Sequence, residues 1–215
     1  MCPAPEFPPQ RETVFIVEDD ASVREALCDL IESAGLQARR FGSAEEFLEF
    51  WAPAMSGCLV LDVRLPEMTG LELQSELAAR KQAIPIIIMT GHGDIPMVRR
   101  ALKGGAIEFL TKPFQDDELL NAIQQAFAAD RARRHVDSIV ASIVARFRTL
   151  SERERQVMEL VTAGRMNKEI ADQLRLSVVT VKLYRRHLMD KMQAASLADL
   201  VKMRARIPDF DQGAR

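Results

Sequence analysis

Three acidic residues that follow two short apolar runs could together bind a divalent cation. Glu18 and Asp19 follow residues 13–17, and Asp62 follows residues 58–61. If both runs form parallel strands of one sheet, these carboxylates meet beyond its carboxyl edge, where open α/β sheets bind ligands. Three crowded carboxylates repel one another and raise at least one pKa unless a cation compensates them. Mg²⁺ suits this pocket because it prefers a few carboxylates together with waters and phosphate oxygens.

Phosphoryl transfer is the reaction that such a pocket could support. With Mg²⁺ bound, a carboxylate can attack phosphorus, since aspartyl phosphates are an established covalent intermediate. Asp62 is the best nucleophile because it comes directly after a buried strand that would hold it rigidly. Thr90 and Lys112 end two later apolar runs, so their side chains could hydrogen-bond and neutralise the phosphoryl oxygens. One acidic residue after a strand is usually a turn or helix cap, but four matched strand ends favour a site.

Five strands alternating with five helices are predicted to position these side chains. Continuous apolar runs at 58–61 and 85–89 are typical of strands buried on both faces. The other strands are predicted at 13–17, 36–41 and 107–110, and the helices at 23–34, after a capping box of Ser43 and Glu46, and at 71–80, 97–103 and 116–127. This alternation predicts an α/β doubly wound fold, with a five-stranded parallel sheet and helices on both faces.

The charge is unevenly distributed along the 215 residues. Residues 1–129 carry 11 Lys and Arg against 20 Asp and Glu, a net charge of −9. Residues 130–215 carry 18 against 11, a net charge of +7, so the chain as a whole has only −2. The asymmetry predicts an acidic module joined to a basic one that could meet nucleic acid.

The composition excludes several classes of protein. Hydrophobic residues make up 47% and charged residues 28%, which argues against collagen, long disorder and disulfide scaffolds. The three cysteines, Cys2, Cys28 and Cys58, have no metal-type spacing and are interpreted as reduced thiols. Residues 1–10 lack an apolar signal-peptide core, and no apolar run approaches the roughly 20 residues of a membrane helix. We therefore expect a soluble cytoplasmic protein without a membrane partner.

The basic half is predicted to be all helical. Ser151 and Glu154 form a capping box, Gly164 ends that helix, and Ser196 opens the last one. Between them lie helices at 167–174 and 178–192, separated by a short turn. A helix, a short turn and a second helix are typical of DNA-binding motifs.

The helix at 178–192 has two different faces. Val181, Tyr184, Leu188 and Met192 form an apolar stripe that should face the core. The opposite side presents Lys182, Leu183, Arg185 and Arg186. Cationic side chains can reach guanine edges or phosphates, and an apolar one can meet a thymine methyl group in the major groove. The alternative is a solvated charged face, but the helix–turn–helix context and the positive charge of this half favour DNA.

Residues 129–148 join the two halves and are open to two interpretations. They either form a helical linker that continues the preceding helix, or present an apolar stripe to another subunit or to the other domain. That stripe consists of Ile139, Ile143 and Phe147.

The acidic half resembles the receiver domain of bacterial two-component response regulators, which is flavodoxin-like, over residues 12–128. Four blocks carry the resemblance: Val-Phe-Ile-Val-Glu18-Asp19-Asp20, Leu61-Asp62-Val-Arg-Leu-Pro66-Glu-Met-Thr-Gly70, Met89-Thr90-Gly-His-Gly-Asp94 and Phe109-Leu-Thr-Lys112-Pro113-Phe. The resemblance implies that Asp62 accepts phosphate from a histidine kinase. It also implies that Mg²⁺ is held by Glu18, Asp19, Asp62 and the main-chain carbonyl of Arg64.

The same resemblance assigns further roles. Thr90 and Phe109 are implied to be the paired switch residues, and Lys112 the partner of the phosphate. The Lys112–Pro113 bond is expected to be cis. Glu18 stands where many receivers have Asp, which lengthens the arm but keeps a hard oxygen ligand.

Residues 149–207 resemble the four-helix LuxR-type helix-turn-helix domain, so that the whole chain is similar to the FixJ/NarL class. The blocks are Leu150-Ser-Glu-Arg-Glu154-Arg-Gln-Val-Met, Asn167-Lys168-Glu-Ile-Ala171 and Ser177-Val-Val-Thr180-Val-Lys182-Leu-Tyr-Arg185-Arg-His-Leu-Met-Asp-Lys-Met192. The resemblance implies base contacts from Lys182, Leu183 and Arg186, with Lys168, Thr180 and Arg185 nearer to phosphates. Ser151 and Tyr184 stand where Thr and His are usual.

These inferences predict a phosphorylation-dependent DNA-binding transcription regulator. Phosphate on Asp62 would shift the receiver to a state that dimerises and binds double-stranded promoter DNA. Such a protein catalyses only its own aspartyl phosphorylation and dephosphorylation. Three alternatives remain: a dehalogenase-type phosphatase, a receiver that is never phosphorylated, and an adaptor whose helical tail binds protein. The phosphatase is disfavoured because Arg64 stands where that class has a second Asp.

Overall fold

The computed structural model describes residues 12–91 and 95–208. Residues 1–10, Cys2 and the end of the Thr90–Asp94 block lie outside the described residues. The chain divides into two compact units, Met1–Arg133 and Arg134–Arg215, which are considered separately. No helix in the described ranges combines the length and the apolar composition that crossing a bilayer requires.

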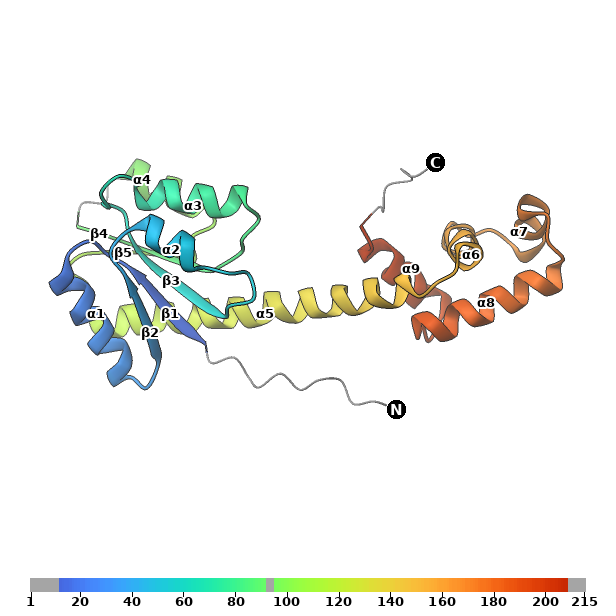
Figure 1. Cartoon of the computed structure of the whole chain (residues 1–215), viewed down its shortest axis with the longest axis horizontal. Coiled ribbons are helices and arrows are strands. Elements are labelled where there is room, and N and C mark those ends of the chain that lie inside the picture. Colours follow the sequence, from blue (N-terminus) through green and yellow to red (C-terminus); the bar gives the residue numbers. More distant parts are fainter. Residues whose placement is uncertain (1–11, 92–94, 209–215) are drawn as a thin grey trace. The chain divides into compact units, whose positions relative to one another are not determined.

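The first unit is a five-stranded parallel sheet in the order β2-β1-β3-β4-β5. The strands are β1 (Thr13–Val17), β2 (Gln37–Phe41), β3 (Gly57–Asp62), β4 (Ile86–Thr90) and β5 (Glu108–Thr111). The helices that alternate with them are α1 (Ala21–Ser33), α2 (Ala44–Phe50), α3 (Gly70–Ala79), α4 (Ile95–Lys103) and α5 (Asp116–Arg148). α1 and the first part of α5 cover one face of the sheet, and α2, α3 and α4 cover the other (Figure 1). The predicted doubly wound fold is confirmed.

Apolar side chains of the central strands are buried on both faces of the sheet. Phe15 and Val17 on β1 join the cluster beneath α2, α3 and α4, whereas Val14 and Ile16 join the cluster beneath α1 and α5. Burial of each such side chain contributes about 1.5–3 kcal/mol. The strand ends are therefore held rigidly, which is what a site at the carboxyl edge of the sheet requires.

Only one of the two hydrogen bonds of the predicted capping box of Ser43 and Glu46 is present. Ser43 Oγ accepts a hydrogen bond from Glu46 N at 3.2 Å, as a capping box requires. The Glu46 carboxylate, however, accepts from Gly42 N at 2.8 Å, one residue before the predicted donor. The glutamate thus ties down the residue that links β2 to α2 and leaves the box incomplete.

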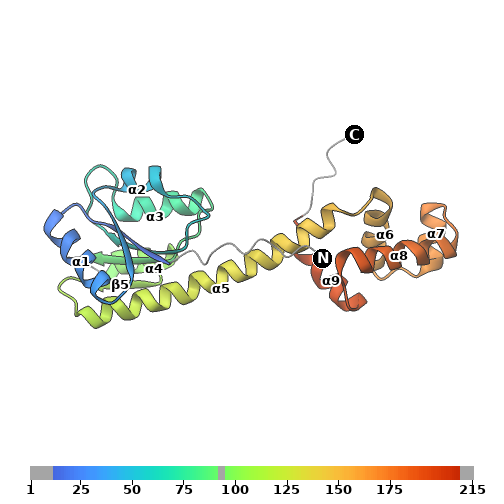
Figure 2. The ribbon, with the colours of Figure 1, turned by 60° about the horizontal axis from the view of Figure 1, so that its bottom comes forward.

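The second unit packs the last part of α5 with four further helices. These are α6 (Glu152–Thr162), α7 (Asn167–Leu174), α8 (Val178–Met192) and α9 (Leu197–Arg206). Figure 2 shows α7 beside the N-terminal part of α8. The predicted capping box of Ser151 and Glu154 is confirmed, and Ser196 caps α9.

Residues 129–148 form the C-terminal part of α5, so the segment is helical and continues the preceding helix, as the first interpretation expects. Ile143 and Phe147 are buried in the core of the second unit, with Ile139 packed against them. The sequence suggests that this apolar stripe could face another subunit or the other domain. In the structure it packs against the helices of the C-terminal domain.

Candidate functional site

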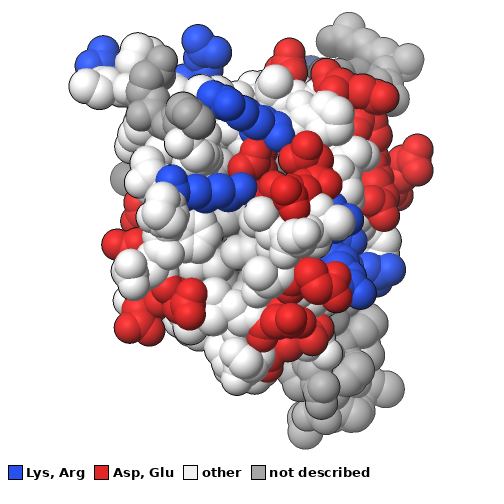
Figure 3. All heavy atoms as spheres, turned by 90° about the vertical axis from the view of Figure 1, so that its left-hand side faces the viewer, with Lys and Arg blue, Asp and Glu red and all other residues white. Residues whose placement is uncertain are grey.

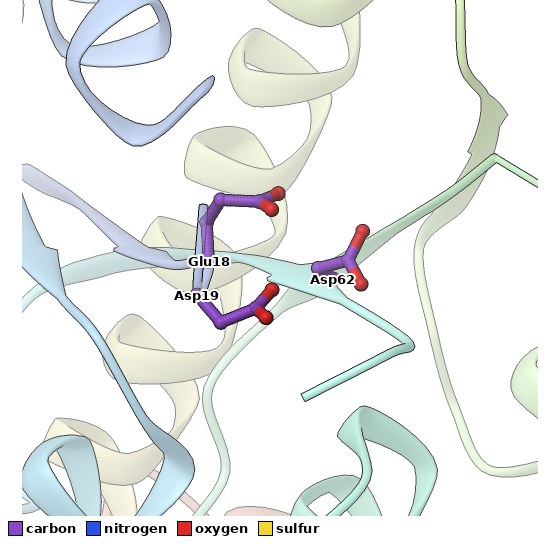
Figure 4. A group of neighbouring side chains, drawn as sticks. All are labelled: Glu18, Asp19 and Asp62. Atoms are coloured by element: carbon purple, nitrogen blue, oxygen red, sulfur yellow. The ribbon is translucent and has the colours of Figure 1, made fainter. Parts of the chain in front are cut away.

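Three carboxylates converge at the carboxyl edge of the sheet. β1 and β3 are hydrogen-bonded neighbours, so Glu18 and Asp19, which follow β1, lie beside Asp62, the last residue of β3. One oxygen from each carboxylate lies within 4.8 Å of the others, and the Glu18 and Asp19 side chains point toward Asp62 (Figure 4). Glu18 and Asp62 are only 3% and 5% exposed, whereas Asp19 is exposed. Figure 3 shows acidic side chains gathered on this face with cationic ones beside them.

Lys112 joins two of these carboxylates from the end of β5. Its Nζ lies 2.6 Å from Glu18 Oε2 and 2.6 Å from Asp62 Oδ1. The pKa of Glu18 is raised, chiefly because the side chain is buried. Repulsion from Asp62 raises this pKa further, whereas the hydrogen bond from Lys112 acts to lower it. Burial alone would lower the pKa of Lys112, but the bonds to Asp62 and Glu18 outweigh it and raise that pKa. The Lys112–Pro113 bond is cis, as expected.

The ligand chemistry of this pocket fits Mg²⁺. Among the described residues, three carboxylates cluster here and the Lys112 ammonium pairs with two of them, so acidic groups outnumber the cation at this site. Clustered carboxylate oxygens are the hard donors that Mg²⁺ takes. Arg64 comes two residues after Asp62, and its amide nitrogen donates to Asp62 Oδ2 at 2.5 Å.

The remaining predicted receiver residues lie on the strands next to the pocket. Thr90 is the fully buried last residue of β4, and its carbonyl accepts from Lys112 N at 2.8 Å. Phe109 on β5 is half-buried and packs against the cluster beneath α3 and α4. Thus Lys112 contacts the carboxylates directly, while Thr90 and Phe109 stand on the neighbouring strands.

Two residues that support the pocket were not predicted as site residues. A Cβ on Gly70 would lie 2.2 Å from the Asp62 carbonyl oxygen, so only glycine lets α3 begin this close to the end of β3. Arg24 on α1 donates to the main-chain carbonyls of Glu18 and Asp19. The glycine could have been suspected from the tight Asp62–Gly70 loop, but the arginine contact has no signature in residue type or spacing.

The predicted DNA-binding residues on α8 divide into exposed and engaged side chains. Val181, Leu188 and Met192 are buried, and Tyr184 packs against the same core, which leaves the opposite side of the helix open. On that side Lys182 and Arg186 are exposed, and Leu183 is 52% exposed.

Engaged side chains tie α8 to its surroundings. Arg185 Nη1 donates to Asn167 Oδ1 at 2.6 Å, which fixes α8 against the start of α7. The Thr180 and Ser177 hydroxyls lie 2.8 Å apart at the N-terminus of α8. Lys168 is exposed on α7.

Exposed apolar residues at the start of α8 were missed. Val179 is 77% exposed and Val178 is 39% exposed. Helical spacing from the buried Val181 could have shown that Val179 lies off the core face.

Comparison with known families accounts for both units. Response regulator receiver domains match residues 14–124, and the luxR family of bacterial regulatory proteins matches residues 148–204. The chain belongs to the two-component response regulators. Its receiver implies a cognate histidine kinase, and its LuxR-type domain is a DNA-binding domain of transcription regulators. Receiver domains generally bind Mg²⁺ at their acidic pocket, which in this response regulator is the Glu18, Asp19 and Asp62 cluster.

Relatives match this response regulator over most of its length. It is 54% identical over 190 residues to nodulation protein W of Bradyrhizobium diazoefficiens, covering 88% of this chain and 84% of the relative. It is 44% identical over 192 residues to transcriptional regulatory protein FixJ of Rhizobium meliloti, covering 89% and 94%. The structure of response regulator StyR matches with a TM-score of 0.79 and 46% identity, over 91% of this chain and 99% of that one. The resemblance identified from the sequence blocks is confirmed.

Proposed function

We propose that Asp62 is the phosphoacceptor of this response regulator and that a sensor histidine kinase supplies the phosphoryl group. The observation that carries this proposal is the buried Asp62 carboxylate, which is bonded to Lys112 and clusters with the acidic pair that follows β1. An Asp62 oxygen attacks phosphorus, and a P–O bond forms as the P–N bond of the kinase phosphohistidine breaks. The imidazole takes a proton from solvent as it leaves.

Glu18, Asp19, Asp62 and the main-chain carbonyl of Arg64 would hold Mg²⁺ in this step. The bound ion supplies positive charge to the phosphoryl oxygens. Lys112, already 2.6 Å from Asp62 Oδ1, is close enough to pair with a phosphoryl oxygen added there. The Arg64 amide bond to Asp62 Oδ2 orients the other carboxylate oxygen.

Phosphorylation acts through a shift of population between two receiver states. The phosphoryl group on Asp62 attracts the Thr90 hydroxyl, and Phe109 turns inward into the space that opens. These movements reshape the surface of α4, β5 and α5. On α4, Ile95 and Leu102 are 75% and 49% exposed beside Arg99 and Lys103, so the helix offers apolar area and charge to a second copy. The receiver then dimerises.

A dimer presents two copies of α8 to promoter DNA in the bacterial cytoplasm. Lys182, Leu183 and Arg186 contact base edges in the major groove, because they are exposed on the side of α8 away from its core. We assign Lys168, Thr180 and Arg185 to contacts nearer to the phosphates. Two recognition helices read two half-sites of one operator.

The decisive experiment replaces Asp62 by Asn in the full chain and measures labelling by a small radiolabelled phosphodonor with Mg²⁺. We expect labelling to be lost, because an amide oxygen is not a competent nucleophile toward phosphorus. Asp29→Asn, the same substitution at an exposed position of α1, is the control and should be labelled like the wild type. Persistent labelling of Asp62→Asn at another residue would overturn the assignment.

A further inference from the structure

Arg24 contacts the backbone of the acidic loop from the first part of α1. Its Nη1 donates to the carbonyl oxygen of Glu18 at 2.6 Å and to that of Asp19 at 3.1 Å. The side chain is half-buried. One guanidinium nitrogen thereby holds two consecutive carbonyl groups of the segment that leads from β1 into α1.

These two carbonyl groups belong to the peptide planes on either side of Asp19. Because each peptide unit is planar, holding both carbonyl oxygens restrains the φ and ψ angles of Asp19 and hence the direction of its Cβ. The Asp19 side chain is exposed and is not oriented by core packing, unlike that of the buried Glu18. The direction of the Asp19 carboxylate therefore depends on its backbone.

Neighbouring contacts hold the ends of the same segment. Glu18 N donates to the Phe41 carbonyl on β2 at 3.2 Å. Asp20 Oδ1 accepts from Ser22 N and Val23 N, so that this third acidic side chain caps α1. Between the strand and the cap, the Glu18 and Asp19 carbonyls are bonded by Arg24, and the two carboxylates face the pocket (Figure 4).

We propose that Arg24 is a positioning residue of the cation site, which orients the Asp19 carboxylate toward Glu18 and Asp62. This inference rests on the proposed Mg²⁺-dependent function of that pocket. Arginine suits the task because its guanidinium is always charged and its donors lie in a rigid plane. Groups that orient metal ligands from outside the coordination shell change metal affinity by about 10- to 100-fold when they are removed.

The test is a Mg²⁺ titration of the full chain. The amide nuclear magnetic resonance shifts of the pocket residues report binding at each Mg²⁺ concentration. We expect Arg24→Ala to bind Mg²⁺ about 10- to 100-fold more weakly than the wild type. Arg24→Lys keeps a cation that can donate to both carbonyls and should recover at least half of the loss on a logarithmic scale. Arg40→Ala is the control, because Arg40 pairs with Glu25 on the exposed surface beside α1, and it should bind within about twofold of the wild type.

The urea midpoint of each variant without Mg²⁺ separates positioning from general destabilisation. The inference is supported if Arg24→Ala binds Mg²⁺ more weakly, Arg24→Lys restores binding, and the urea midpoints of the variants do not follow the same order as their Mg²⁺ affinities. If Arg24→Ala binds Mg²⁺ as tightly as the wild type, the inference is overturned while the metal site stands. The inference is also overturned if Arg24→Lys binds Mg²⁺ as weakly as Arg24→Ala. If the wild type itself binds no Mg²⁺, the metal-dependent part of the proposed function fails together with the inference. Should Arg24→Ala not fold, weaker Mg²⁺ binding by Arg24→Lys than by Arg40→Ala at equal urea midpoints supports the inference, and equal binding by these two variants overturns it.

Discussion

Two buried glutamates, one in each unit, bond a lysine at almost the same distance and yet have pKa values shifted in opposite directions. Lys112 Nζ lies 2.6 Å from Glu18, and Lys191 Nζ lies 2.7 Å from Glu154. Burial raises the pKa of Glu18 despite its lysine, helped by repulsion from Asp62. For Glu154 burial also acts to raise the pKa, but the bonds from Lys191 and from Ser151 together lower it.

The difference lies in how completely each charge is bonded inside its own unit. Glu154 accepts from Ser151 N at 2.7 Å, from Ser151 Oγ at 2.9 Å and from Lys191, so its charge is satisfied while it caps α6. Glu18 shares one ammonium with Asp62, and Asp19 adds a third carboxylate. A fully bonded buried charge serves the fold. An under-compensated one in a concave, acidic place is a candidate for binding a further cation.

The largest effect is expected at the acidic pocket, when Lys112, the lysine that Glu18 shares with Asp62, is replaced by Met. We expect phosphorylation by a small phosphodonor with Mg²⁺ to slow about 10²- to 10³-fold, because a charge already aimed at the reacting oxygens is lost. The rate of radiolabel incorporation measures this. Lys81→Met, at an exposed position just after α3, should keep the wild-type labelling rate. A Lys112→Met protein that is labelled at the wild-type rate would remove Lys112 from the proposed step.

The α8 surface should respond differently, because its proposed base-reading residues are not held in place. Both side chains are exposed, and among the described residues neither the Lys182 ammonium nor the Arg186 guanidinium has a hydrogen-bond or ion-pair partner, so each is available to DNA. Lys182→Ala and Arg186→Ala should each weaken binding about 10- to 100-fold to duplex fragments recovered with the protein from its own genome. Folding stability should change by less than about 0.5 kcal/mol, since both positions are exposed.

Fluorescence anisotropy of the full chain at two salt concentrations tests the DNA prediction. Binding should also weaken as salt rises. Lys202→Ala, at an exposed position of α9, is the matched control. If both α8 variants bind DNA normally but lose a protein partner, the chain is an adaptor and not a DNA reader.

The pocket was predictable because sequence order alone places its members. Glu18, Asp62 and Lys112 each lie at or directly after the end of a strand, and parallel strands bring those ends to one edge. The separation of the two faces of α8 followed from helical spacing in the same way. In both regions a local period determined which side chains share a surface.

Contacts that side chains make with other segments were beyond this reasoning. The Arg24 bonds depend on the path of the loop after β1, and the Glu46 bond to Gly42 depends on the angle at which the chain enters α2. The Arg185–Asn167 bond joins residues 18 positions apart through the turn between α7 and α8. No periodicity encodes these geometries, because they arise only when the elements have packed.

Replacing Glu154 by Gln tests the structural side of the comparison and should have the smallest effect. Glutamine can still accept from Ser151 but loses the charged bond to Lys191, so we expect a loss of about 1 kcal/mol in the stability of the second unit at neutral pH. Because folding lowers the pKa of Glu154, its contribution is present above its ordinary value of 4.5 and disappears as pH falls through the lower, folded value. The variant should therefore lose less stability on acidification than the wild type.

Hydrogen exchange of α6 to α9 amides in the full chain, at neutral pH and at a pH below 4.5, measures both effects. Glu152→Gln, in the same first turn but exposed, should leave exchange and its pH dependence almost unchanged. Equal behaviour of the two variants would show that the lysine bond of Glu154 contributes no more than a surface charge does. The contrast with Glu18 would then lie in the excess of carboxylates at the pocket alone, and not in a strongly stabilising pair in the second unit.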